Sequence, residues 1–169
     1  GLLAHGKMID MFNGLDGDGA FAPTRSGAVP VGDLIRLCYS GKYKTVDEMM
    51  KRAVGDAGIA AYLGTADMRE VDQMIANGDK HAKLIKDAFV YQHSKDIGAL
   101  ATAAHGKVDA IILTGGIAHG KDVTDAITAY VGWIAPVIVI PGEREMIALA
   151  QGALRVLNGE EEAKEYVAE

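Results

Sequence analysis

A chain of 169 residues with 49% hydrophobic residues is long enough to bury a sizeable core, and we expect a single domain. Its net charge of −6, from 23 acidic and 17 basic residues, argues against a nucleic-acid or anionic-membrane partner, because either would require a basic surface. The one cysteine, Cys38, excludes an intrachain disulfide and is expected to pack on an apolar helix face. With no apolar run near the roughly 20 residues that cross a bilayer, these features predict a cytoplasmic protein.

The first half of the chain predicts a short hairpin, a long loop and a series of helices. A His5-Gly6 turn separates two short strands, as if the chain began in the middle of a sheet. Segment 13–30, rich in Gly, Asp and Pro, is typical of an ordered loop, and its acidic spacing does not fit a calcium-binding loop. Apolar spacing and glycine breaks then predict three helices, followed by one long helix over about 80–106. The second of the three helices opens with a capping box at 45–48.

The second half predicts a strand, a helix and a strand, and then a final helix. Valine and isoleucine over 108–113 favour a strand covered on both faces, and 136–140 predicts a second strand of the same kind. The amphipathic helix over 123–134 joins them, so the strands are expected to be parallel with a right-handed crossover. The last helix is expected to begin near Glu143 and to turn its apolar side chains inward.

The most informative stretch is the end of the first predicted strand, Thr114-Gly115-Gly116. Glycines leave the backbone bare, so a flat ligand can lie against it, and the following helix would direct its free N–H groups to the same place. A Gly-Gly pair after a strand is more often only a tight turn with no ligand. Both interpretations stay open from these residues alone.

Six segments of the chain, in order, resemble the butyrate kinases. They are residues 15–27, 30–34, 38–43, 61–69, 113–117 and 141–145. Butyrate and acetate kinases are grouped with sugar kinases and actin in the ASKHA superfamily, whose members have two RNase H-like domains with ATP between them. The resemblance implies an α/β fold with a mixed sheet, a parallel βαβ unit and flanking helices. It also implies that residues 1–169 form a single C-terminal domain, without the N-terminal domain and its glycine-rich phosphate loop.

The activity implied by the resemblance is transfer of the γ-phosphate of ATP to a short-chain fatty acid, giving acyl phosphate and ADP with Mg²⁺ as cofactor. Loop 16–21 follows the butyrate kinase version, which favours butyrate over branched-chain acids or acetate. The resemblance further implies a homodimer or a larger homo-oligomer. Because half of the family's architecture is missing, the isolated chain is expected to bind ADP weakly and to be inactive as a kinase.

Two residues resemble catalytic groups of the family. Arg25 corresponds to an arginine held against the transferring phosphoryl group, for which a planar guanidinium is suited. Its purely structural alternative is a loop arginine paired with Asp16 or Asp18. Glu145 corresponds to a glutamate that holds Mg²⁺ through water, although Glu143 is a second candidate, and an acidic residue at a helix start also complements the helix dipole.

Six residues resemble the nucleotide-binding positions. Thr114, Gly115, Gly116 and Ile117 correspond to the adenine shelf, and Asp67 and Arg69 to a pair near the ribose. Asp67 is also a candidate for the start of a helix, and Arg69 for an ordinary surface charge.

Two other classes of function compete with the kinase. The chain alone can be a non-catalytic module that binds a nucleotide or a partner domain. A dinucleotide-binding oxidoreductase is disfavoured, because no Gly-x-Gly-x-x-Gly follows a predicted strand.

Overall fold

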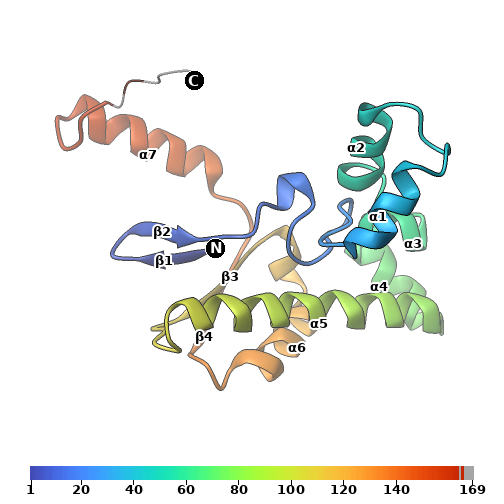
Figure 1. Cartoon of the computed structure of the whole chain (residues 1–169). Helices are drawn as coiled ribbons and strands as arrows, with labels where there is room; N and C mark the ends of the chain where they lie inside the picture. The colour runs from blue at the N-terminus through green and yellow to red at the C-terminus, as the bar shows by residue number, and fades with distance from the viewer. Residues whose placement is uncertain (164, 166–169) are drawn as a thin grey trace.

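A computed structural model describes residues 1–163 and 165, and its centre is one long helix, α5 (Figure 1). Along the chain the elements are β1 (Leu2–Ala4), β2 (Lys7–Asp10), the short 3-10 helix η1 (Gly14–Asp16), α1 (Val31–Cys38), α2 (Val46–Val54), α3 (Gly58–Leu63), α4 (Met68–Ala76), α5 (Lys80–Ala103), β3 (Ile111–Gly115), the 3-10 helix η2 (Gly116–His119), α6 (Lys121–Val131), β4 (Val137–Pro141) and α7 (Glu145–Leu157). In Figure 1, α1 to α4 gather at one end of α5, and α7 extends away from the other end.

Three helices, α2, α4 and α5, begin at a residue whose side chain caps them. Thr45 accepts a hydrogen bond from the Glu48 N–H at 3.2 Å, as the predicted capping box requires. The Glu48 carboxylate in return accepts from the N–H of Lys44, at 2.5 Å, and not from that of Thr45 itself. Asp79 caps α5 by accepting from the N–H groups of His81 and Ala82. The long helix predicted over about 80–106 is confirmed.

The predicted strand, helix and strand are confirmed as the unit β3, α6 and β4. The two strands are parallel, and their register runs from Ile111 opposite Val137 to Gly115 opposite Pro141. The hairpin of β1 and β2 is antiparallel and forms its own two-stranded pair. The strands therefore form one antiparallel and one parallel pair, with helices packed against them.

The core lies where α5 meets α6, α4 and the loop before α1. Phe21 of that loop packs edge-on against Phe89 of α5, with ring centroids 5.8 Å apart. The largest fully buried side chains come from three different helices, namely Ile59, Val71 and Val131. This packing fixes α4, α5 and α6 relative to one another.

Three expectations about burial are wrong. β3 is covered on one face only, since Ile112 is 59% exposed, and β4 is exposed on both faces, since Ile138, Val139 and Ile140 are all exposed. α7 buries none of its residues, because no other part of the described chain packs over its apolar face. Cys38 is exposed rather than packed, because it ends a helix that contributes no buried residue.

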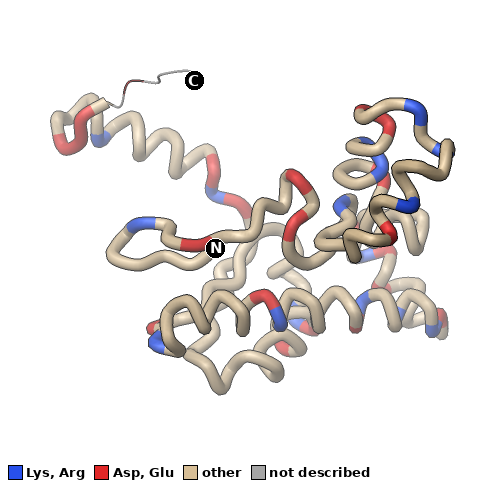
Figure 2. Tube along the Cα trace, in the orientation of Figure 1, with Lys and Arg blue, Asp and Glu red and all other residues tan. Residues whose placement is uncertain are grey.

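Acidic and basic residues are interspersed along most helices of the chain trace (Figure 2). Among the described residues, no helix combines the length and the apolar character that crossing a bilayer demands.

Candidate functional site

The end of β3 forms a bare backbone ledge. Gly115 has φ 84° and ψ 178°, a conformation open almost only to glycine. Its N–H donates to the Gly142 carbonyl at 3.2 Å, and the Gly142 N–H donates back at 3.0 Å, so the ends of β3 and β4 are locked together. The chain that leaves β4 toward Glu143 and Glu145 therefore starts beside the ledge.

A 3-10 turn, η2, separates the ledge from the helix that was expected to follow directly. Gly116 to His119 form this turn, and α6 begins only at Lys121. Gly120 precedes α6 and has no side chain to cap it, so the N-cap position supplies no acceptor, and the carboxylate of Asp122 in the first turn is the side chain that lies against the first N–H groups. Such a helix start carries partial positive charge and favours an anionic ligand.

A cavity of about 620 Å³ lies between η2 and the start of α4. It brings together four of the predicted nucleotide-binding residues, namely Asp67, Arg69, Gly116 and Ile117. Its other lining residues, which the sequence did not single out, are Met68, Asp72, His119, Gly120 and Val123.

The other two predicted shelf residues lie outside this lining. Thr114 instead lines a second, mainly apolar cavity of about 470 Å³ between the hairpin, α5 and β3, and Ile117 lines both cavities. Gly115 lines neither, because its backbone is occupied by the pairing with Gly142. The predicted shelf is thus split, with Gly116 and Ile117 on the side of Asp67.

Asp67 and Arg69 form a tight pair at the start of α4. Asp67 caps the helix by accepting from the Arg69 N–H at 2.9 Å, and its carboxylate also accepts from Arg69 Nε and Nη2 at 3.0 and 2.5 Å. These hydrogen bonds lower the pKa of Asp67 from 3.8 to about 2. The helix-start interpretation of Asp67 is therefore confirmed, and its ionised carboxylate also faces the cavity as an acceptor for hydroxyl groups.

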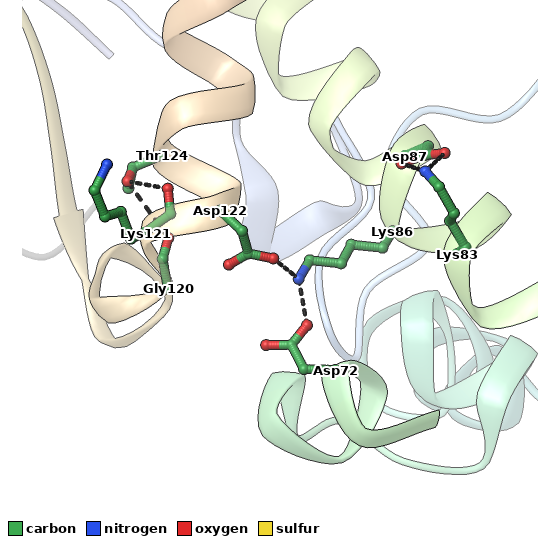
Figure 3. Close-up of polar contacts among 8 residues, drawn as sticks. All are labelled: Asp72, Lys83, Lys86, Asp87, Gly120, Lys121, Asp122 and Thr124. Atoms are coloured by element: carbon green, nitrogen blue, oxygen red, sulfur yellow. Dashed lines mark hydrogen bonds and ion pairs between the residues drawn. The ribbon is translucent and has the colours of Figure 1, made fainter. Parts of the chain in front are cut away.

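Behind the cavity, Lys86 of α5 forms close ion pairs with Asp72 of α4 and Asp122 of α6 (Figure 3). Burial of the ammonium group opposes its charge, but the hydrogen bonds to Asp122 and Asp72 outweigh this and raise the pKa of Lys86 above 10.5. The sequence analysis missed this cluster. The available signal was a lysine among the apolar residues of α5, between Ile85 and Phe89.

Arg25 lies in a loop held by backbone hydrogen bonds on several sides. The Ala22 N–H donates to the Arg25 carbonyl at 3.0 Å, and the Ser26 N–H donates to Ala53 at 2.8 Å. Gly58 packs so closely that a β-carbon there would stand 1.9 Å from the Ala22 carbonyl oxygen. The backbone of the loop that carries Arg25 is therefore held in one conformation by hydrogen bonds and close packing.

The guanidinium of Arg25 forms no ion pair with any residue in the described part of the chain, so pairing with Asp16 or Asp18 is not observed. Those carboxylates instead accept hydrogen bonds from Asn13, at 2.7 Å and 3.3 Å. Arg25 itself is half-buried and does not line the cavity beside Asp67. Its charge thus remains available to a ligand.

Glu145 is the first residue of α7, and Glu143 lies two residues earlier; both are exposed. No group of three or more His, Cys, Asp or Glu side chains gathers as a metal site within the described residues. One or two carboxylates suffice for Mg²⁺ when nucleotide phosphates and water supply its other ligands. The donor set near β4 fits that kind of site and does not fit a cation cage built from protein alone.

Comparison with known proteins gives a consistent result. A sequence profile of the acetokinase family matches residues 2–132. Butyrate kinase 2 of Clostridium acetobutylicum is 54% identical over 162 residues, which are 96% of this chain and 45% of that protein. The chain therefore spans about half the length of the relative it matches.

Two solved structures share the fold. Acetate kinase of Porphyromonas gingivalis has a TM-score of 0.73 at 23% identity, over 83% of this chain and 41% of that chain. A propionate kinase of Francisella tularensis has a TM-score of 0.65 at 24% identity, over 77% of this chain and 39% of that chain. The expected α/β fold of the acetate kinase type is thereby confirmed.

Proposed function

The chain belongs to the acetokinase family, and on that premise we propose that it is the nucleotide-binding half of a carboxylate kinase. The whole protein would transfer the γ-phosphoryl group of ATP to a short-chain fatty acid, giving acyl phosphate and ADP. The observation that carries the proposal is the cavity that joins the Gly116–His119 turn, the uncapped start of α6 and the Asp67–Arg69 pair.

The nucleotide is proposed to bind in this cavity. The bare backbone at Gly116, next to the apolar Ile117, would accommodate the flat adenine ring, because no side chain intervenes at the glycine. The ionised Asp67 carboxylate accepts hydrogen bonds from the ribose hydroxyls. Arg69, whose side chain is mostly exposed, would stack the face of its guanidinium on the base while its N–H groups donate to Asp67.

Phosphoryl transfer requires placement and charge stabilisation more than covalent assistance from the protein. Arg25 is proposed to supply that stabilisation, because its planar guanidinium matches two phosphoryl oxygens and its loop is fixed. Glu145, or Glu143 beside it, would hold Mg²⁺ through water. The bound ion would neutralise charge on the phosphates, and the carboxylate of the fatty acid would attack directly.

The acceptor is proposed to be butyrate, with branched-chain acids and acetate as alternatives. The support for butyrate is the 54% identity to a protein named Butyrate kinase 2. A homo-oligomer in the cytoplasm is proposed on the same grounds. Turnover measured with butyrate, isobutyrate and acetate in parallel would rank the acceptors.

A non-catalytic module is the second candidate for this chain by itself. It is favoured by one observation, that Arg25 does not line the cavity. We expect the 169-residue chain to bind ADP weakly and to show negligible turnover. Robust turnover by this chain alone would contradict the proposal that it is only the nucleotide-binding half of the kinase.

The decisive test is Arg25→Ala in the protein encoded by the complete reading frame, with acyl phosphate trapped by hydroxylamine. Turnover should fall by about 10²-fold or more while ADP affinity changes little, because the lost group acts on the transferring phosphoryl. Arg36→Ala is the matched control, since Arg36 is exposed and pairs with Asp33 at 2.7 Å. Turnover of Arg25→Ala near that of the control would remove Arg25 from the chemistry.

A further inference from the structure

Lys86 is a buried cation that the proposed chemistry does not use. Its side chain is 9% exposed, and it projects from α5 among residues of the apolar core. Its ammonium group lies between two carboxylates that belong to different helices, Asp72 and Asp122 (Figure 3). A lysine is rarely buried unless such partners are present.

The two partners of Lys86 belong to α4 and α6, the two helices whose first turns contribute lining residues to the cavity beside the ledge. Asp72 lines the cavity directly and lies five residues after Asp67, on the same helix α4. Asp122 is in the first turn of α6, two residues after Gly120, which also lines the cavity. Lys86 of α5 thus links α4 and α6 by ion pairs, and both of these helices contribute to the cavity lining.

We propose that Lys86 is a positioning residue that fixes the separation of α4 and α6 at the cavity and thereby sets the affinity for the nucleotide. This inference rests on the proposed function, because it assumes that the cavity takes ADP.

Charge supports the same assignment. The ammonium of Lys86 offsets one of two carboxylates beside a site for an anionic ligand, and it lowers the pKa of Asp122 below 3.8 even though desolvation opposes this. Asp122 lies at the helix start that is proposed to attract the nucleotide. Without Lys86, two uncompensated carboxylates would repel the phosphates.

The test is Lys86→Met in the full-length protein, with ADP and adenosine affinities measured by calorimetry alongside the KM for butyrate. ADP affinity should fall by about tenfold, while the KM for butyrate should stay within about twofold. Adenosine, which lacks phosphates, should lose less affinity than ADP. Lys86→Arg should recover most of the ADP affinity, because it restores a cation at the same place.

Lys83→Met is the matched control, because Lys83 lies one turn earlier on α5 in an exposed pair with Asp87. Its ADP affinity should equal that of the wild type. A purely structural Lys86 would lower the unfolding temperature of Lys86→Met and leave the ADP affinity of the folded protein unchanged, and that result would overturn the inference.

If Lys86→Met does not fold, Asp72→Asn and Asp122→Asn test the same link, since both carboxylates are about half exposed. Each removes one of the two ion pairs of Lys86 and should weaken ADP binding, even though it also removes a negative charge that opposes the phosphates. Wild-type or tighter ADP affinity in both variants would overturn the inference. A wild-type protein that fails to bind ADP would instead overturn the proposed function, so the two failures are distinguishable.

Discussion

Two helices of this chain show how differently the same kind of sequence can be used. α5 buries seven of its 24 residues against α3, α4 and α6, and the cavity and the Arg25 loop are both fixed to it. α7 has 13 residues, is rich in leucine and alanine, and buries none of them. Burial is therefore decided by the element that faces a helix, and apolar content alone does not predict it.

A similar contrast separates the two faces of β3. The face toward α5 and α6 holds Ile111, which is buried, whereas Ile112 on the opposite face is exposed. Side chains alternate between faces along a strand, so one covered face gives this pattern. The proposed nucleotide cavity is lined in part by Val123, a buried core residue of α6, so packing holds that wall.

The contrast between the packed core around α5 and the exposed α7 should have its largest effect on the free energy of unfolding. Ile59→Ala should lower the free energy of unfolding by about 2–5 kcal/mol, because Ile59 is fully buried and its removal leaves a cavity. Leu149→Ala, at a position that is 69% exposed on α7, should change it by less than about 0.5 kcal/mol. Urea unfolding of both variants measures the difference, and equal losses would show that α7 is packed as well as α5.

A smaller effect is expected at the ledge. Gly115→Ala should cost about 1–3 kcal/mol, because alanine at φ 84° is strained even though the space around it is open. Gly98→Ala is the matched control, since Gly98 is inside α5 and also has open space, so it should stabilise the chain by about 0.5–1 kcal/mol. Thermal unfolding of the two variants should give shifts of opposite sign; a neutral Gly115→Ala would refute the strained ledge.

The smallest expected effect is on the pKa of a single carboxyl group, that of Asp67. Asp67 should titrate at about 2, and Arg69→Gln should return its pKa toward 3.8. Because the folded pKa lies below the unfolded one, the pair stabilises the chain fully above pH 3.8, and this contribution is lost as the pH falls toward 2. NMR titration of the carboxyl carbon reads the value directly, and an Asp67 pKa that Arg69→Gln does not move would contradict the pairing.

Local rules predicted the elements well. The capping residues at Thr45 and Asp67, the turn at Gly6 and the βαβ unit all depend on neighbours in sequence, and all are present. The 3-10 turn after Gly115 was missed, because a Gly-Gly pair does not specify how the chain continues after it.

Long-range features were predicted less well. The open faces of β4 and α7 depend on which other elements cover them, and hydrophobic periodicity contains no such information. The Lys86 cluster joins three helices that are distant in sequence, so only the folded chain brings its members together. For the same reason, sequence could name Asp67 and Gly116 as separate candidates but could not show that they line one cavity.

The most direct test of the proposed nucleotide site is a titration of the ¹⁵N-labelled 169-residue chain with ADP, followed by amide NMR. The largest shifts should appear at Gly116, Ile117, Gly120 and Arg69, on the two sides of the cavity. Unchanged chemical shifts at these four amides in saturating ADP, or changes concentrated on α7, would contradict the proposed nucleotide site.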